Sequence, residues 1–324
     1  MSGFAFGETI SGRGVVGTTL LELADAHPNV WGLTADVGDP IASFARAHPD
    51  RYIDVGVAEA NLAGIAAGLA LEGMIPFIAG MAPFVTMRAL EQNRTDICYQ
   101  DLPVRLIGWG AGLVNAAGST HNAMEDIALM KALVNMTVVS VGDPNMIAAI
   151  MRQSVEHPHP LYLRIGKGKA DRMLYDPETT AAPIGTGLVA RDGTDATIFA
   201  HGEIVWEALM AAEDLTADGI DTRVIDMYTI KPLDTDLVFR AVEETGNIVV
   251  LEDHLMEGGL ASSLADAFVD HGVHPKRFTR LGTPQVYVGF GSAQEQWTKY
   301  GYDRAATVAT VREMLDVQVV SDTT

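Results

Sequence analysis

A single carboxylate stands in a small, apolar run at the start of an expected helix. Glu59 lies in the segment DVGVAEAN, residues 54–61, and a helical pattern follows from Ala60 to Leu71. Burial there would disfavour the charged form, so this side chain is suited to exchanging a proton with a nitrogen heterocycle. The alternative is an exposed acid that complements the positive end of the helix dipole.

A histidine in the segment GSTHNAME, residues 118–125, is the second candidate. Ser119 or Thr120 can cap the helix expected from Asn122 to Leu133. His121 would then lie at the helix N-terminus, where the dipole favours a neutral ring that can donate or accept a hydrogen bond. Glu125 would lie on the same face, four residues further on. A plain capping or loop histidine is the alternative.

Three other segments have residue types that suit ligand binding. Residues 83–87, PFVTM, could form an apolar platform for a flat ring, and core packing is the alternative. Residues 164–169, RIGKGK, place three cations among glycines after a strand, which suits an anionic group such as phosphate. Arg13 in SGRG, residues 11–14, is either a phosphate clamp or a surface residue.

Metal and thiol chemistry find little support in the sequence. Cys98 is the only cysteine, which excludes a disulfide framework and a cysteine-based metal site and favours a core thiol. The segments 201–203, HGE, and 252–254, EDH, lack a second ligand pair at metal-binding spacing. We therefore interpret both as loops that follow strands, and we predict no metal site in this chain.

Alternating apolar and amphipathic stretches predict the elements that position these residues. Strands are expected at Val30–Thr34, Ile75–Ala79, Val104–Trp109, Thr137–Val141 and Leu161–Ile165, with helices at Ala60–Leu71, Phe84–Tyr99, Asn122–Leu133 and Pro144–Glu156. A second α/β pattern has strands at Ala196–Ala200, Thr222–Asp226 and Asn247–Leu251, and helices at Glu203–Asp214, Leu233–Glu244 and Leu260–His271. Such alternation predicts an α/β protein with two domains, each a mostly parallel sheet flanked by helices. We place them at residues 1–170 and 191–324, joined by a linker at 171–190.

Composition limits the partners and the compartment. The chain has 324 residues, 48% of them hydrophobic, and a formal net charge of -20, which argues against nucleic acid and anionic membrane partners. No secretory signal pattern or membrane-spanning run is visible, so we expect a cytoplasmic protein.

Small residues follow one face of the helix after Glu59. Ala60, Gly64, Ala67, Gly68 and Leu71 fall on one broad face at three- and four-residue spacing. A helical glycine costs about 1 kcal/mol relative to alanine. Close contact with the core would explain the glycines. A tight helix pair across a subunit interface would explain them equally, and would place Glu59 near a partner chain.

Taken together, these segments resemble the C-terminal portion of a transketolase, most closely the separate subunit of split transketolases. Residues 54–61 match the segment of the cofactor-activating glutamate, and 119–121 with Glu125 match the substrate-histidine motif. Residues 226–234, 252–254 with 258–260, and 299–301 match features of the family's C-terminal domain. The resemblance covers nearly the whole chain, with the motifs in the family's order.

The resemblance implies thiamine diphosphate as cofactor and transfer of a two-carbon ketol unit between sugar substrates. Glu59 corresponds to the carboxylate bonded to N1′ of the cofactor's aminopyrimidine ring, and Phe84 to an aromatic of the pyrimidine pocket. His121 corresponds to a residue that bonds the donor hydroxyls. Arg13 and Lys167 fall where the family has phosphate-contacting cations.

The family's diphosphate site is missing from this sequence. Transketolases bind the diphosphate through Mg²⁺ at a Gly-Asp-Gly motif of an N-terminal domain, and no such motif occurs here. The resemblance therefore implies a separately encoded N-terminal subunit that holds the diphosphate and Mg²⁺. The expected assembly has two copies of each chain, with the cofactor between subunits.

Three positions depart from ordinary transketolases. Ala117 stands where they have an aspartate that reads an acceptor hydroxyl, and Trp109 stands near a position usually held by a phosphate-contacting histidine. Met87 replaces a second pyrimidine-facing aromatic. We therefore expect a non-standard acceptor or donor. A deoxyxylulose phosphate synthase-like enzyme or a 2-oxoacid dehydrogenase β subunit remains an alternative, as does a non-catalytic regulatory subunit.

Overall fold

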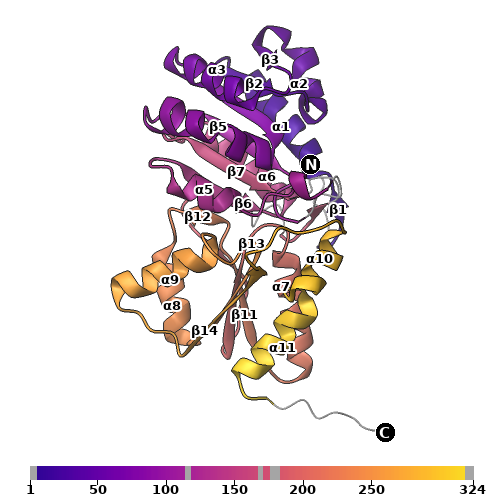
Figure 1. Cartoon of the computed structure of the whole chain (residues 1–324), viewed down its shortest axis with the longest axis vertical. Helices are drawn as coiled ribbons and strands as arrows, with labels where there is room; N and C mark the ends of the chain where they lie inside the picture. The colour runs from indigo at the N-terminus through magenta and orange to yellow at the C-terminus, as the bar shows by residue number, and fades with distance from the viewer. Residues whose placement is uncertain (1–5, 114–117, 167–170, 176–182, 318–324) are drawn as a thin grey trace.

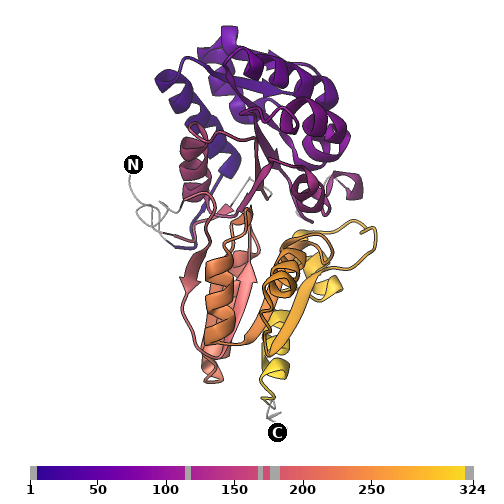
Figure 2. The ribbon, with the colours of Figure 1, turned by 90° about the vertical axis from the view of Figure 1, so that its left-hand side faces the viewer.

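The computed structural model describes residues 6–113, 118–166, 171–175 and 183–317. Two α/β units are stacked along the long axis of the molecule, and each is a sheet with helices on both faces (Figures 1 and 2). The predicted fold class is confirmed. The division at residues 170 and 191 stays a proposal, because the junction is more closely joined than a linker would suggest.

The first unit is built on a seven-stranded sheet in the order β12-β6-β7-β5-β4-β2-β3. Its strands are β2 (Val30–Thr34), β3 (Tyr52–Asp54), β4 (Ile75–Met81), β5 (Arg105–Trp109), β6 (Thr137–Val141), β7 (Leu161–Ile165) and β12 (Thr229–Lys231). All described pairs are parallel except β12 with β6. Every residue of β5, β6 and β7 is buried, as expected for parallel strands covered on both faces.

Helices cover both faces of this sheet. Helix α1 (Gly12–Ala26) packs against α6 (Pro144–Ser154) and α2 (Ala42–Ala47) on one face. On the other face, α3 (Glu59–Leu71) packs against the segment after β4, and α5 (Asp126–Ala132) lies nearby. Ser11 and Asp143 cap α1 and α6 by accepting backbone hydrogen bonds, as their residue types predict.

The second unit is a five-stranded sheet in the order β14-β13-β10-β11-β9. Its strands are β9 (Leu188–Arg191), β10 (Ala196–Ala200), β11 (Thr222–Asp226), β13 (Asn247–Leu255) and β14 (Arg277–Thr283). Among its described pairs, only β9 with β11 is antiparallel. Its helices are α7 (Val205–Ala217), α8 (Thr235–Glu244), α9 (Leu260–His271), α10 (Ala293–Tyr300) and α11 (Arg304–Met314).

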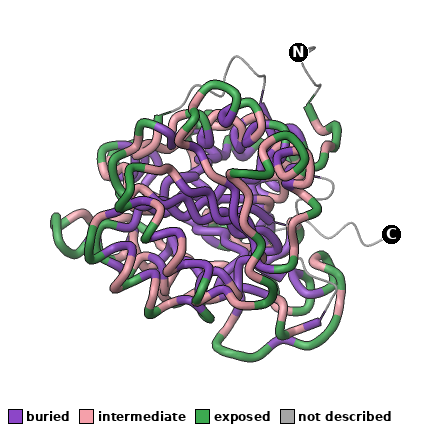
Figure 3. The backbone as a smooth tube through the Cα atoms, turned by 90° about the horizontal axis from the view of Figure 1, so that it is seen from above, coloured by how far each residue is buried: buried purple, intermediate pink, exposed green. Residues whose placement is uncertain are grey.

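The two units share a strand and a core. β12 lies after the second unit has begun, yet it completes the edge of the first sheet beside β6. Lys231 then donates hydrogen bonds to the carbonyls of Lys131 and Leu133 at the end of α5. Within the expected linker, the short strand β8 (Asp171–Arg172) pairs with β1 (Thr9–Ile10). One hydrophobic cluster contains buried residues of both units, such as Ile147 and Val205, and buried residues occupy the centre of the view from above (Figure 3).

Candidate active site

The expected site residues lie at the carboxyl ends of parallel strands of the first sheet. Glu59 follows β3, Phe84 follows β4 and His121 follows β5. Because parallel strands end at the same edge, residues that are far apart in sequence converge there, which is where ligands bind in open α/β sheets.

Glu59 is the first residue of α3 and its side chain is only 5% exposed. The turn before it is shaped by Asp54, whose carboxylate accepts backbone hydrogen bonds from Asp36 and Gly56 at 2.9 and 3.0 Å. Gly56 has a φ of +68°, a backbone region that glycine adopts without strain. This turn directs the chain into α3 with the carboxylate facing inward, so the burial predicted from the sequence is confirmed.

Two side chains, Arg88 and His121, contact the Glu59 carboxylate or the Phe84 ring beside it. Arg88 donates a hydrogen bond to Glu59 Oε2 at 2.8 Å, and its guanidinium lies 4.2 Å from the centre of the Phe84 ring. His121 meets the same ring edge-on, with centroids 5.1 Å apart and an interplanar angle of 79°. The structure therefore brings Glu59, Phe84 and His121 into one contiguous group. Arg88 was missed, although its spacing of four from Phe84 places it over that ring.

The segment after β4 is not the single helix predicted for Phe84–Tyr99. It consists of two π-helical turns, Phe84–Arg88 and Asn93–Cys98, separated by the short helix α4 (Leu90–Gln92). Thr86 donates to the carbonyl of Ala82, and the Asn93 amide donates to the carbonyl of Val85, so these carbonyls have side-chain partners. Widened turns of this kind occur frequently at functional sites.

The prediction of a helix from Asn122 to Leu133, with His121 at its N-terminus, is wrong about where the helix begins. Ser119–His121 form a separate 3₁₀ turn, and α5 begins only at Asp126. The reason is a long-range contact, since the backbone of Ala123 exchanges two hydrogen bonds with Gly112 and is held extended. The His121 ring is half-buried, and its Nδ1 is 3.1 Å from the hydroxyl of Thr120. Glu125 is the residue directly before α5.

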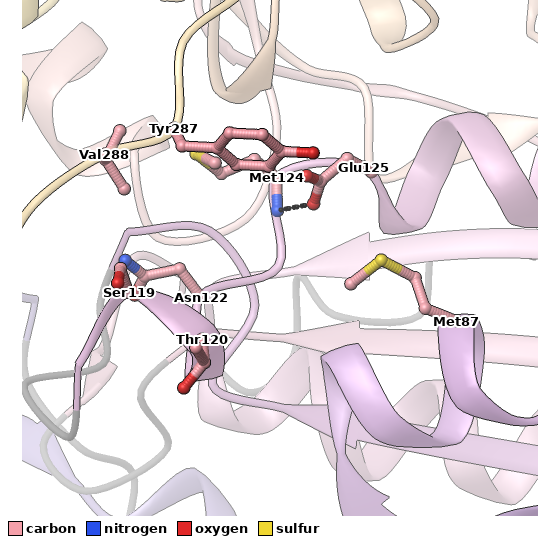
Figure 4. Close-up of a pocket in the computed structure, with 8 residues that line it drawn as sticks. All are labelled: Met87, Ser119, Thr120, Asn122, Met124, Glu125, Tyr287 and Val288. Atoms are coloured by element: carbon pink, nitrogen blue, oxygen red, sulfur yellow. Dashed lines mark hydrogen bonds between the residues drawn. The ribbon is translucent and has the colours of Figure 1, made fainter.

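A cavity of about 370 Å³ opens beside this group (Figure 4). Residues of both units line it, and they are Met87, Ser119, Thr120, Asn122, Met124, Glu125, Tyr287 and Val288. Tyr287 comes from the second unit and extends over the cavity near Glu125 (Figure 4). Sequence reasoning missed Tyr287, because no local pattern relates it to the first unit.

Glu125 is the only charged side chain among the described residues of this lining. Burial raises the pKa of its carboxyl group, although the backbone N–H of Met124 donates to it at 3.1 Å. A carboxyl group of this kind can exchange hydrogen bonds with hydroxyl groups of a bound molecule.

Arg164 is not available for phosphate, contrary to the expectation for residues 164–169. It is 3% exposed and donates to the fully buried Asp126 at 2.8 Å and to the carbonyl of Asp253 at 2.8 Å. The hydroxyl of Tyr162 donates to the same Asp126 carboxylate at 2.7 Å. These contacts fix the start of α5 against β7 and β13, which makes Arg164 a structural residue.

The remaining predicted substrate residues lie elsewhere or outside the described part. Trp109 is 1% exposed and packs in the core, and the guanidinium of Arg13 lies 5.2 Å from its ring centre. Burial lowers the pKa of Arg13, and the nearby Asp171 carboxylate offsets only part of this effect. The core position of Trp109 gives no support for direct substrate contact. Ala117 and Lys167 lie outside the described residues.

The segment 252–254 is not a loop, as the sequence had indicated, but part of β13, and it is buried. Glu252 accepts backbone hydrogen bonds from Leu260 and Ala261 at the start of α9, and its Oε2 is 3.7 Å from His201. Across the residues that the structure describes, no three His, Cys, Asp or Glu side chains are grouped to hold a metal ion. The neighbouring residues Asp253 and His254 join the two units, because Arg164 donates to the Asp253 carbonyl and the backbone N–H of Ala128 donates to His254 Nε2 at 3.4 Å.

The residues around Glu59 fit a flat, nitrogen-bearing ring. The space beside the carboxylate and over the face of Phe84 already accommodates a planar N–H donor, the guanidinium of Arg88. A buried carboxylate next to an aromatic face can bind a ring nitrogen along one edge and stack on its plane. Met87, 38% exposed and lining the adjacent cavity, adds an apolar contact.

Comparison with protein-family models gives two matches. The model "Transketolase, pyrimidine binding domain" matches residues 8–172, and "Transketolase, C-terminal domain" matches residues 185–306. In the described part of the chain, no helix has both the length and the apolar composition needed to span a bilayer.

Two curated relatives illustrate the range of similar proteins. One of the subunits of the apulose-4-phosphate transketolase of Phocaeicola vulgatus is 33% identical over 300 residues, covering 92% of this chain and 95% of that protein. 1-Deoxy-D-xylulose-5-phosphate synthase 1 of Geobacter metallireducens is 34% identical over 311 residues, covering 95% of this chain. The chain spans about half the length of the synthases that it matches.

A solved structure described as "Split gene transketolase, inactive beta4 tetramer" is similar over its full length. It has 34% sequence identity and a TM-score of 0.85, and the match covers 97% of this chain and 100% of that one. The chain therefore belongs to the transketolase family and carries its pyrimidine-binding and C-terminal domains.

Proposed function

We propose that this protein is the C-terminal subunit of a thiamine diphosphate-dependent transketolase in the cytoplasm, which transfers a two-carbon ketol unit between sugar substrates. The observation that carries this proposal is the buried Glu59 carboxylate beside the Phe84 ring, with His121 on the edge of that ring. Bound thiamine diphosphate supplies the nucleophilic carbon that accepts the two-carbon unit.

The chain's own residues then have distinct tasks. Glu59 would hold a proton at N1′ of the pyrimidine ring, and its burial strengthens that hydrogen bond by excluding water. Phe84 would support the plane of the ring, and Met87 would contact its edge. His121 would exchange hydrogen bonds with donor hydroxyls. Arg13 and Lys167 are our candidates for phosphate contacts.

The cavity beside Met87 supports a non-standard acceptor. None of its eight described lining residues is a cation, whereas a phosphate group is normally bound by Arg or Lys. Ser119, Thr120, Asn122 and Glu125 instead offer partners for hydroxyl groups. Together with Ala117 in place of an aspartate, this favours an unphosphorylated or modified end of the acceptor in this cavity.

A second subunit would complete the site. This chain has no Gly-Asp-Gly motif, so the diphosphate and Mg²⁺ are assigned to an N-terminal partner, in an assembly with two copies of each chain.

The face of α3 that carries Gly64 and Gly68 supports such an assembly. A methyl group added at Gly68 would meet no described atom within 4 Å and one at Gly64 only an Asp96 oxygen at 3.8 Å, so core packing among the described residues does not explain these glycines.

The test is reconstitution with the co-purified partner, followed by a panel of sugar donors and acceptors. We expect ketol transfer that requires both chains and thiamine diphosphate, and that falls by at least about 100-fold in Glu59→Gln. Unchanged turnover in Glu59→Gln would instead indicate a non-catalytic regulatory subunit. Xylulose 5-phosphate with ribose 5-phosphate as the best pair would refute the non-standard acceptor.

A deoxyxylulose phosphate synthase-like activity is the second candidate, favoured by the 34% identity to such synthases over 311 residues. That activity releases CO2 from a 2-oxoacid, whereas ketol transfer releases none. Incubation of the reconstituted pair with labelled pyruvate separates the two, because only the synthase-like reaction yields labelled CO2.

A further inference from the structure

Arg88 occupies an unusual position in the group around Glu59. Its guanidinium contacts the two side chains that the proposed function assigns to the cofactor's pyrimidine ring, donating to Glu59 at 2.8 Å and lying 4.2 Å from the centre of the Phe84 ring. The side chain of Arg88 is 45% exposed, whereas that of Glu59 is 5% exposed. A buried carboxylate is thus neutralised by a cation that reaches it from the solvent side.

The guanidinium group shares with a pyrimidine ring the features that suit binding beside Glu59 and Phe84. It is planar, it presents N–H donors in its plane, and it stacks on aromatic faces. A carboxylate that is withdrawn from water and left without a partner is destabilised by its lost hydration. The Arg88 contact removes that penalty as long as no other donor is bound.

We propose that Arg88 holds the place of the pyrimidine ring in the cofactor-free chain and must swing outward before thiamine diphosphate can bind to Glu59. The inference rests on the proposed function and adds a positioning residue to it. The guanidinium contacts Glu59 and Phe84, which are the same groups that the pyrimidine ring would contact. The guanidinium and the pyrimidine ring therefore cannot bind there at the same time. The exposure of Arg88 lets its charged end return to water when it leaves.

This arrangement lowers the apparent affinity for the cofactor. Only the fraction of chains with Arg88 displaced is competent to bind, and the apparent dissociation constant rises by the inverse of that fraction. One half-exposed ion pair together with one cation–π contact corresponds to a factor of about five to ten. In return, the buried carboxylate keeps a partner before the cofactor arrives.

The pairing itself is tested on the isolated chain by a double-mutant cycle. Arg88→Met removes the charge and the donors while keeping an unbranched side chain, and Glu59→Gln removes the charge of the acceptor. Urea unfolding of the wild type, both single variants and the double variant should show a coupling equivalent to about a fivefold change in the unfolding equilibrium. Additive effects of the two substitutions would overturn the inference.

The place-holding role is tested by titrating thiamine diphosphate, with Mg²⁺ present, into the reconstituted complex in a calorimeter. We expect Arg88→Met to bind about five- to tenfold more tightly than the wild type, with a smaller dependence on salt. Arg94→Met is the matched control, since Arg94 is an exposed arginine of the same segment, and it should bind like the wild type.

Two failures are distinguishable. If the wild-type complex binds thiamine diphosphate and Arg88→Met binds it equally or more weakly, Arg88 is packing or a direct cofactor ligand, and this inference alone is overturned. If the wild-type complex binds no thiamine diphosphate, the proposed function falls and this inference falls with it.

Discussion

Replacing Asp126 by alanine would remove the carboxylate that joins the start of α5 to β7. Asp126 is fully buried and accepts hydrogen bonds from Arg164 Nε at 2.8 Å and from the Tyr162 hydroxyl at 2.7 Å. Burial and the Asp126 carboxylate raise the pKa of Tyr162 well above its usual value, so its hydroxyl stays protonated and donates. The substitution leaves a buried cation and a buried hydroxyl without this acceptor.

The magnitude follows from that burial. Breaking a buried ion pair by removing one partner costs about 3–5 kcal/mol, and an unsatisfied buried hydroxyl costs about 1–3 kcal/mol. The two costs belong to one network and do not simply add. Arg164 also keeps its hydrogen bond to the carbonyl of Asp253, which reduces the loss. We therefore expect Asp126→Ala to lower the free energy of unfolding by about 4 kcal/mol.

The assay is urea unfolding followed by tryptophan fluorescence, with the midpoint and the slope fitted separately. The matched control is Glu22→Ala, because Glu22 accepts two hydrogen bonds from Arg152 at 2.9 and 2.8 Å on the surface. Both of those side chains are about half exposed, so the control should lose less than about 1 kcal/mol. Equal losses in the two variants would refute the argument from burial.

Three other predictions concern α3, Asp226 and Cys98. Gly68→Ala should stabilise the isolated chain by about 0.5–1 kcal/mol, because the added methyl group meets no described atom, and should weaken association in sedimentation velocity; unchanged association would contradict an interface there. Burial raises the pKa of Asp226 to about 8, so the folded state keeps a proton that the unfolded chain releases above about pH 4. The contribution of Asp226 to the free energy of unfolding should therefore fall as the pH rises between about 4 and 8, by at most about 1.4 kcal/mol per pH unit. In urea unfolding over this range, the wild type should lose more stability relative to Asp226→Asn as the pH rises, and a constant difference between the two would count against this assignment. Burial also raises the pKa of the Cys98 thiol to about 12, so a thiol reagent should label it only on unfolding, and rapid labelling of the native chain would exclude a core position.

The inner strands of both sheets were predictable because their signal is local. Val30–Thr34, Thr137–Val141 and Ala196–Ala200 are apolar runs of five residues, and each is a strand with the predicted bounds. The edge strands β3, β9, β12 and β14 were not predicted. In β12, for example, three residues that pair with a distant strand carry no periodicity of their own.

Helix boundaries at the site were less predictable because they depend on contacts with distant parts of the chain. The residues around His121 have good helix-capping types, yet the backbone pairing of Ala123 with Gly112 postpones the helix to Asp126. A local propensity of about 1 kcal/mol was outweighed by tertiary hydrogen bonds. The π-helical turns after β4 likewise coincide with side-chain bonds to carbonyls that a helical pattern does not reveal.

The sequence by itself determined the family, the α/β class and the residues that carry the proposed chemistry, because motif order and apolar periodicity are properties of the chain. Only the tertiary structure decided that Arg88 contacts Glu59 and Phe84. It also decided that Arg164 forms an ion pair with Asp126, and that Tyr287 of the second unit lines the cavity. These contacts join segments that are far apart in the sequence and come together only when the sheets form. Their energies depend on burial, which no stretch of sequence defines before the rest of the chain has packed around it.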